Sequence, residues 1–221
     1  MAEINHYLIP IALGFFPAIA WLIFFSLEDR MHPEPKKMLF KVFIVGVISA
    51  LGAAVLQLIV QDTAFAYFGI KEIDKVSFII FASIEEIVKF IAVYLTVKGS
   101  KYLDEPVDFM MYMITGALGF AAIENSLFLL NKGPQIVLEI MVLRAVGATL
   151  LHALSSGFFG FYWARRKIFI GLLMAAVLHS GFNYLILTFN EAPVYATAIL
   201  IFASFFLFYD FDIIKEDERE E

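Results

Sequence analysis

The chain has 221 residues, of which 61% are hydrophobic, and its mean hydropathy is +0.82. Soluble domains are about 45–50% apolar, so this composition excludes an ordinary soluble domain and indicates a membrane protein. The absence of cysteine excludes disulfides, thiolate metal sites and cysteine nucleophiles. The net charge of -6 comes largely from the C-terminal stretch KEDEREE, and nothing in this pattern predicts a nucleic-acid partner.

Apolar blocks of membrane-spanning length follow one another along the chain. A span needs about 20 mostly apolar residues. Seven segments meet or approach this requirement: 7–27, 42–60, 76–97, 107–130, 137–163, 168–190 and 194–209. No Lys or Arg precedes Arg30, so the first block lacks the basic start of a secretory signal peptide and is interpreted as a retained span. The segment 61–75 is too charged to span, and we expect it to lie along the membrane interface.

The sequence therefore predicts an all-α, polytopic membrane helix bundle with about seven transmembrane helices. No internal repeat or low-complexity stretch divides the chain, so residues 1–221 are predicted to form one integral-membrane domain. An acidic cytoplasmic tail is expected from about residue 210 to residue 221. The lipid bilayer is then the main partner of the protein's surface.

The distribution of Lys and Arg predicts the orientation of the bundle, because cytoplasmic loops carry an excess of positive charge. With the N-terminus outside, Lys71, Lys75 and Lys132 lie outside, and Lys89 and Arg144 lie within spans. The remaining eleven of the sixteen basic residues then lie on the cytoplasmic side. We therefore expect an extracytoplasmic N-terminus and a cytoplasmic C-terminus.

Ionisable side chains lie within four successive predicted spans, where a central charge costs about 2.5–3.5 kcal/mol on insertion scales. The set comprises Glu85, Glu86, Lys89, Glu124, Arg144, His152 and His179, with Asn125 and Asn183 beside them. We interpret this set as one shared polar cavity. Intramembrane ionisable residues are functional candidates by default.

Helical spacing indicates which of these groups converge. Glu85 and Lys89 are four residues apart and share a face, whereas Glu86 neighbours Lys89 at a spacing of three. His179 and Asn183 also share a face. These spacings predict that Lys89 pairs with Glu85 and that Asn183 orients His179.

A structural explanation exists for each residue taken singly. An ion pair between helices would account for the adjacent acids and the lysine, and a lone intramembrane histidine often makes only a helix–helix hydrogen bond. Arg144 is interpreted as the counter-charge of Glu124, and Ser155 and Ser156 as small packing residues. These explanations account poorly for three glutamates, two histidines and a lysine on four successive spans.

Two routes to hydrolysis are open to this set. His152, His179 and a carboxylate, with Glu124 as the candidate, would bind Zn²⁺ with an open fourth position and lower the pKa of bound water to about 7. Alternatively, a buried carboxylate is the general base without any cofactor, and a histidine or asparagine stabilises the oxyanion. The sequence contains no HExxH motif, the common zinc-protease signature.

Four motifs in order along the chain resemble the PrsW family of intramembrane proteases: EEIVK (85–89), GFAAIEN (119–125), the helix with His152, and HSGFN (179–183). EDRMHPEP (28–35) and DEPVDFMMY (104–112) also resemble segments of that family. The resemblance implies a multi-pass protease of the prokaryotic plasma membrane. Its substrate would be a membrane-anchored protein, such as an anti-sigma factor, cleaved on the extracytoplasmic side.

The resemblance also implies which residues form the site: Glu85, Glu86, Lys89, Glu124, Asn125, His152, His179 and Asn183. Either Glu85 or Glu86 would hold the attacking water, and position favours Glu85 because it shares the face of Lys89. Two other classes of function compete with this interpretation. One is an ion- or proton-coupled transporter or channel, and the other is a non-enzymatic membrane assembly factor. The chain shows no inverted repeat of the kind found in many transporters.

Overall fold

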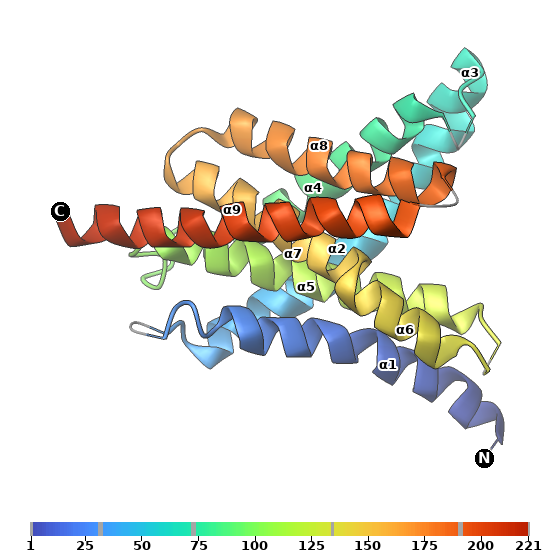
Figure 1. The fold of residues 1–221 in the computed structure, drawn as a ribbon, viewed down its shortest axis with the longest axis horizontal. Coiled ribbons are helices and arrows are strands. Elements are labelled where there is room, and N and C mark those ends of the chain that lie inside the picture. The colour runs from blue at the N-terminus through green and yellow to red at the C-terminus, as the bar shows by residue number, and fades with distance from the viewer. Residues whose placement is uncertain (1, 31–32, 72–73, 134, 190–191, 221) are drawn as a thin grey trace.

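The computed structural model describes residues 2–30, 33–71, 74–133, 135–189 and 192–220, with only the backbone at 2–6, 192–193 and 217–220. Its helices, in chain order, are α1 (Ala2–Phe25), α2 (Lys36–Val60), the π-helical turn η1 (Gln61–Phe65), α3 (Ala66–Phe68), α4 (Lys75–Val97), α5 (Pro106–Leu130), α6 (Val137–Val146), α7 (Ala148–Ala164), α8 (Ile168–Thr188) and α9 (Ala192–Glu220). The described residues include no strand, so the prediction of an all-α bundle is confirmed (Figure 1).

Six helical stretches are long and apolar enough to cross a membrane: Tyr7–Phe25, Lys36–Phe68, Pro106–Leu130, Val137–Ala164, Ile168–Thr188 and Val194–Glu216. The sequence predicts seven crossings, and the difference lies in α4. This helix has 23 residues, but Glu85, Glu86 and Lys89 make it too charged to qualify by composition. Figure 1 shows the two chain ends at opposite ends of the long axis, as an odd number of crossings requires.

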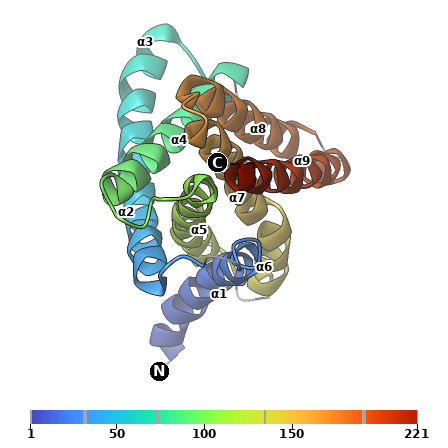
Figure 2. The same cartoon turned by 90° about the vertical axis from the view of Figure 1, so that its left-hand side faces the viewer.

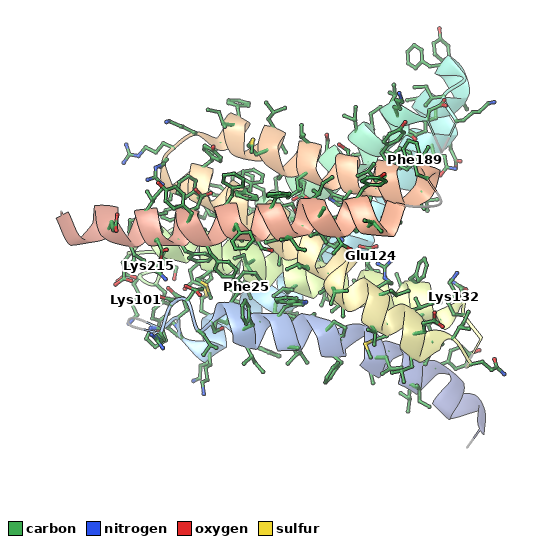
Figure 3. All side chains as sticks on the ribbon, in the orientation of Figure 1. Phe25, Lys101, Glu124, Lys132, Phe189 and Lys215 are labelled. Atoms are coloured by element: carbon green, nitrogen blue, oxygen red, sulfur yellow. The ribbon has the colours of Figure 1, made fainter. Side chains whose placement is uncertain are left out.

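The basic residues also separate along the long axis. Lys101 and Lys215 lie near the end of the molecule that holds the C-terminus, whereas Lys132 lies near the end that holds the N-terminus (Figure 3). The predicted orientation depends on this separation of basic residues between the two ends of the bundle. The prediction that the C-terminal end faces the cytoplasm stays a prediction.

Helix α5 lies at the centre of the bundle, with α1, α2 and α7 packed around it (Figure 2). In its most apolar window 72% of residues are buried, against 28–39% in the other five qualifying stretches. The reason is close packing at small residues. A Cβ atom added to Gly46 of α2 would lie 2.0 Å from the Gly116 carbonyl oxygen of α5, so the two backbones are in direct contact.

Two predicted segments have different boundaries in the structure. Residues 61–68 continue α2 through the π-helical turn, so they extend the second crossing and form no separate interfacial segment; residues 72 and 73 lie outside the described residues. The predicted span 137–163 is divided at Gly147, whose φ of -100° and ψ of -96° are not helical. Leu151 N–H still donates to the Gly147 carbonyl at 2.9 Å. The helical hydrogen bonds therefore resume directly after Gly147, and the break is a bend in the helix.

The last helix is also longer than the predicted span 194–209. It runs through the stretch predicted as a tail, and Phe211 and Ile214 are buried against the bundle. The Lys215 ammonium lies 3.1 Å from a carboxylate oxygen of Glu28, which ties this end of α9 to the segment after α1. The part of α9 packed against the bundle therefore extends to Ile214, beyond the predicted start of the tail at residue 210.

The contact between α2 and α5 predicts a difference between two glycines of α2. Gly46→Ala would force the backbones of α2 and α5 apart, and overpacking of this kind costs about 1–3 kcal/mol. Gly52→Ala is the matched control, since its added Cβ would meet no atom within 4 Å. Because alanine is favoured over glycine inside a helix, this change should leave stability unchanged or raise it by up to about 1 kcal/mol. Thermal unfolding of both variants in detergent tests the prediction, and equal melting temperatures would contradict it.

Candidate functional site

The residues predicted to form the site come from four helices: Glu85, Glu86 and Lys89 from α4, Glu124 and Asn125 from α5, His152 from α7, and His179 and Asn183 from α8. Helix α7 packs against α5 and α8, and α8 packs against α4, so these helices are neighbours. Glu124 lies in the middle part of the long axis, between the ends marked by Lys101 and Lys132 (Figure 3). Seven of the eight residues join one network of ion pairs and hydrogen bonds, and Asn183 does not.

Glu86 is the centre of one half of this network. Its Oε1 lies 2.7 Å from the Lys89 ammonium and 2.7 Å from His179 Nδ1. Ser155 and Ser156 donate hydrogen bonds to its two oxygens at 3.2 and 3.4 Å. The side chains of Glu86 and Lys89 are fully buried, so the two serines supply polar contacts here besides filling space between helices.

This arrangement corrects the predicted pairing of Lys89. The spacing of four favours Glu85, but the lysine forms its ion pair with Glu86 at a spacing of three. The reason lies in the neighbouring helix. From this position the Lys89 ammonium also donates to His152 Nδ1 at 3.2 Å, and that atom belongs to α7.

Glu124 is the centre of the other half. Its Oε1 lies 2.7 Å from an Arg144 guanidinium nitrogen, and its Oε2 lies 2.7 Å from His152 Nε2. The interpretation of Arg144 as the counter-charge of Glu124 is thereby confirmed. Arg144 Nε donates to Asn125 Oδ1 at 2.6 Å, and Asn125 Nδ2 donates to the Thr149 hydroxyl at 2.8 Å, so Asn125 holds Arg144 in place.

The partners of the two histidines define their tautomers. His152 accepts from the Lys89 ammonium at Nδ1, so its proton is on Nε2 and points to Glu124. His179 has Nδ1 against Glu86, so its proton is on Nδ1 and its Nε2 is left with a lone pair. That Nε2 lies 3.6 Å from Oε2 of Glu85.

Glu85 has one oxygen free for chemistry. Its Oε1 accepts a hydrogen bond from Gln57 Nε2 at 2.8 Å, whereas its Oε2 is buried and has no hydrogen-bond partner. A buried polar atom without a partner is rare in proteins and points to a ligand or a reacting group. Reasoning from the sequence did not find Gln57. The signal that could have found it is a long polar side chain within segment 42–60, which contains no charged residue.

Three side chains are placed to hold a metal ion. Glu85, His152 and His179 each offer one ligand atom, and these atoms all lie within 4.8 Å of one another. The predicted metal set had Glu124 in place of Glu85, but both oxygens of Glu124 are occupied by Arg144 and His152. His152 also has both nitrogens in contact with other side chains, so it would have to give up one of these contacts to bind a metal.

Asn183 does not have the role that its spacing predicts. Nδ1 of His179 is bound by Glu86, and within the described part of the chain Asn183 forms no hydrogen bond with His179. A carboxylate on α4 therefore orients this histidine across the helix interface. A carboxylate that accepts from the second nitrogen of a metal-binding histidine is a recurrent arrangement.

Taken together, the fold and this network define a class: a polytopic membrane protein whose buried glutamates and histidines are arranged for metal-assisted or general-base hydrolysis. The model of the PrsW family intramembrane metalloproteases matches residues 34–209, and the chain belongs to this family. It is therefore an intramembrane protease, and its family is described as metal-dependent.

Curated relatives agree with this assignment. Protease PrsW of Geobacillus kaustophilus (strain HTA426) is 30% identical over 186 residues, which are 80% of this chain and 79% of that protein. Protease PrsW of Bacillus subtilis (strain 168) is 25% identical over 209 residues, which are 89% of this chain and 91% of that protein. No solved structure matches the chain.

The two adjacent glutamates are expected to differ in their effect on stability. Glu86→Gln leaves the fully buried Lys89 without its partner, and breaking a buried ion pair in this way costs about 3–5 kcal/mol. Glu85→Gln keeps an oxygen for Gln57 and removes no lysine partner, so we expect a loss below about 1 kcal/mol. Thermal unfolding in detergent measures both, and a larger loss for Glu85→Gln would contradict the assignment of Glu86 as the structural acid.

Proposed function

We propose that this protein hydrolyses a peptide bond of a membrane-anchored substrate at the cluster of Glu85, His152 and His179, with Zn²⁺ as the metal. The observation that carries the proposal is the buried Oε2 of Glu85, which has no hydrogen-bond partner and lies 3.6 Å from the free nitrogen of His179. Among the six carboxylate oxygens of Glu85, Glu86 and Glu124, it alone has no hydrogen-bond partner in the described part of the chain.

Two nitrogens and one carboxylate oxygen form the ligand set of many catalytic zinc sites, which keep a fourth position open for water. Glu85, His152 and His179 would hold the ion. When bound, Zn²⁺ polarises the substrate carbonyl and lowers the pKa of its bound water to about 7. Glu86 accepts the Nδ1 proton of His179, which keeps the lone pair of Nε2 directed toward Glu85.

Glu85 has a second possible role, that of the general base. In this route its Oε2 receives the proton of water, the water oxygen bonds to the carbonyl carbon, and the leaving nitrogen takes up a proton as the C–N bond breaks. Both routes need the Glu85 carboxylate, and they differ in whether its loss also removes the metal.

An apolar groove between α4 and α8 supplies a route for the substrate. Its volume is about 670 Å³, and Phe78 and Ile79 of α4 face Ala176, Ser180 and Gly181 of α8 along it. Ser180 of the groove follows His179 in the chain, so the groove passes the segment of α8 that carries this histidine, although Glu85, His152 and His179 do not line it. An apolar lining suits a transmembrane segment of the substrate.

The proposed substrate is accordingly a membrane-anchored regulator of the anti-sigma-factor type in the bacterial cell membrane. With the N-terminus outside, cleavage would fall on the extracytoplasmic side. A fusion reporter before Met1 should be extracytoplasmic and one after Glu221 cytoplasmic; two reporters on the same side, or the reverse arrangement, would contradict this orientation.

We expect Glu85→Gln to lower the rate of cleavage of a single-span reporter substrate at least about a hundredfold, in line with the contribution of a general base. Glu139→Gln is the control, because Glu139 is an exposed glutamate of α6 outside the network. The metal content of both purified variants is measured together with the rate. Loss of zinc in Glu85→Gln alone assigns the carboxylate as a ligand, and retained zinc assigns it as the base.

Wild-type cleavage by Glu85→Gln would contradict both assignments and leave the acid as a polar packing residue. His152→Ala and His179→Ala extend the test, since each removes one nitrogen from the ligand set. Both are expected to lose zinc, and retention of zinc by both would contradict the metal site.

The groove is tested at Gly181, where an added Cβ would meet no atom within 4 Å. Gly181→Leu therefore fills the groove without disturbing the core, and displacing the substrate should slow cleavage at least about tenfold. Gly181→Ala, which adds only a methyl group, should stay close to the wild-type rate. The melting temperatures of both variants should equal that of the wild type, and wild-type cleavage by Gly181→Leu would rule out this route.

A further inference from the structure

A second cluster of acids lies near the end of the molecule that holds the C-terminus. Asp29 follows α1, Glu34 precedes α2, and Asp108 lies in the first turn of α5. Each offers one carboxylate oxygen, and these oxygens lie within 4.8 Å of one another. Glu28, the neighbour of Asp29, is paired with Lys215, which Figure 3 shows near the C-terminal end. The cluster joins the motifs EDRMHPEP and DEPVDFMMY, which the hydrolytic site does not use.

Two of these oxygens are buried without a partner. Asp29 is 5% exposed and Asp108 is 1% exposed, yet Oδ2 of Asp29 and Oδ1 of Asp108 form no hydrogen bond. The other oxygen of Asp108 has a local task, because it accepts the backbone N–H groups of Asp104 and Glu105 at 3.0 and 2.7 Å at the start of α5. Capping of α5 therefore accounts for the burial of Asp108 Oδ2. It does not account for the burial of Oδ1 without a hydrogen-bond partner.

The acids also have no ion pair with a lysine or arginine among the described residues. Lys215 forms its ion pair with Glu28 and acts on Asp29 only from beyond ion-pair distance. Three buried carboxylates without a cation are costly, and a bound cation removes that cost.

We propose that Asp29, Glu34 and Asp108 form a second metal site, for a hard divalent cation such as Ca²⁺ or Mg²⁺. The donors are all carboxylate oxygens, which these ions prefer, whereas the site between the helices offers two nitrogens and suits zinc. A polar cavity of about 470 Å³, lined among others by Glu34, Asp104 and Asp108, gives the ion access and room for water ligands. The bound ion joins the segment between α1 and α2 to the start of α5, the central helix.

Terbium luminescence tests this site directly, because Tb³⁺ is a hard cation and the Tyr112 hydroxyl donates to Glu34. With the purified full-length protein in detergent, we expect saturable, tyrosine-sensitised Tb³⁺ emission that Ca²⁺ or Mg²⁺ displaces. Asp29→Asn and Asp108→Asn should weaken Tb³⁺ binding at least tenfold. Asparagine at 108 keeps an oxygen for the backbone N–H groups, so the cap of α5 survives.

Asp104→Asn is the matched control, since it removes the same charge from the rim of the cavity without removing a proposed ligand. It should bind Tb³⁺ as the wild type does. Absence of saturable emission in the wild type, failure of both Ca²⁺ and Mg²⁺ to displace it, or an equal loss in Asp104→Asn would overturn the proposal. Should Asp108→Asn fail to fold, Asp29→Asn decides alone. Ca²⁺ or Mg²⁺ should also raise the melting temperature of the wild type and leave that of Asp29→Asn unchanged.

Discussion

The buried ion pair between Glu86 and Lys89 is the interaction on which the rest of the site depends. Two charges in a membrane interior are stable only when their remaining hydrogen-bonding positions are filled. Glu86 fills its positions with His179 and two serines, and Lys89 fills one with His152. Neutralising these charges therefore also sets the tautomer of both histidines. The contacts that make the two charges tolerable are therefore the same contacts that orient the histidines.

The packing of α5 explains how such a network is held between helices. Glycines bring the α2 and α5 backbones into direct contact, which fixes the height at which Glu124 and Asn125 face α7. Helix α4 is too charged to cross a membrane by composition, and it is accommodated because its acids and lysine face α7 and α8. The charges of α4 are therefore tolerated because the close packing of α5 against α2 holds the neighbouring helices in place.

The two carboxylate clusters have different chemistry although both contain buried oxygens without partners. Glu85 lies beside two histidines in the middle of the bundle, where a nitrogen-rich set suits zinc and hydrolysis. Asp29, Glu34 and Asp108 offer oxygens alone at one end of the bundle, where a hard cation would fasten the loop before α2 to the central helix. Catalysis and the fastening of the fold are in this way assigned to separate sites.

The sequence by itself determined the class of fold and which buried polar residues of four helices come together, because uninterrupted apolar blocks must span a bilayer and charges within them need a shared cavity. It also determined the pairing of Arg144 with Glu124. Tertiary structure alone decided that Lys89 pairs with Glu86, that Glu86 and not Asn183 orients His179, and that Glu85 has the free oxygen. Spacing along one helix fixes only which side chains share a face. The partner that each side chain meets depends on how the neighbouring helices approach, and this depends on contacts such as Gly46 against Gly116 that no single helix contains.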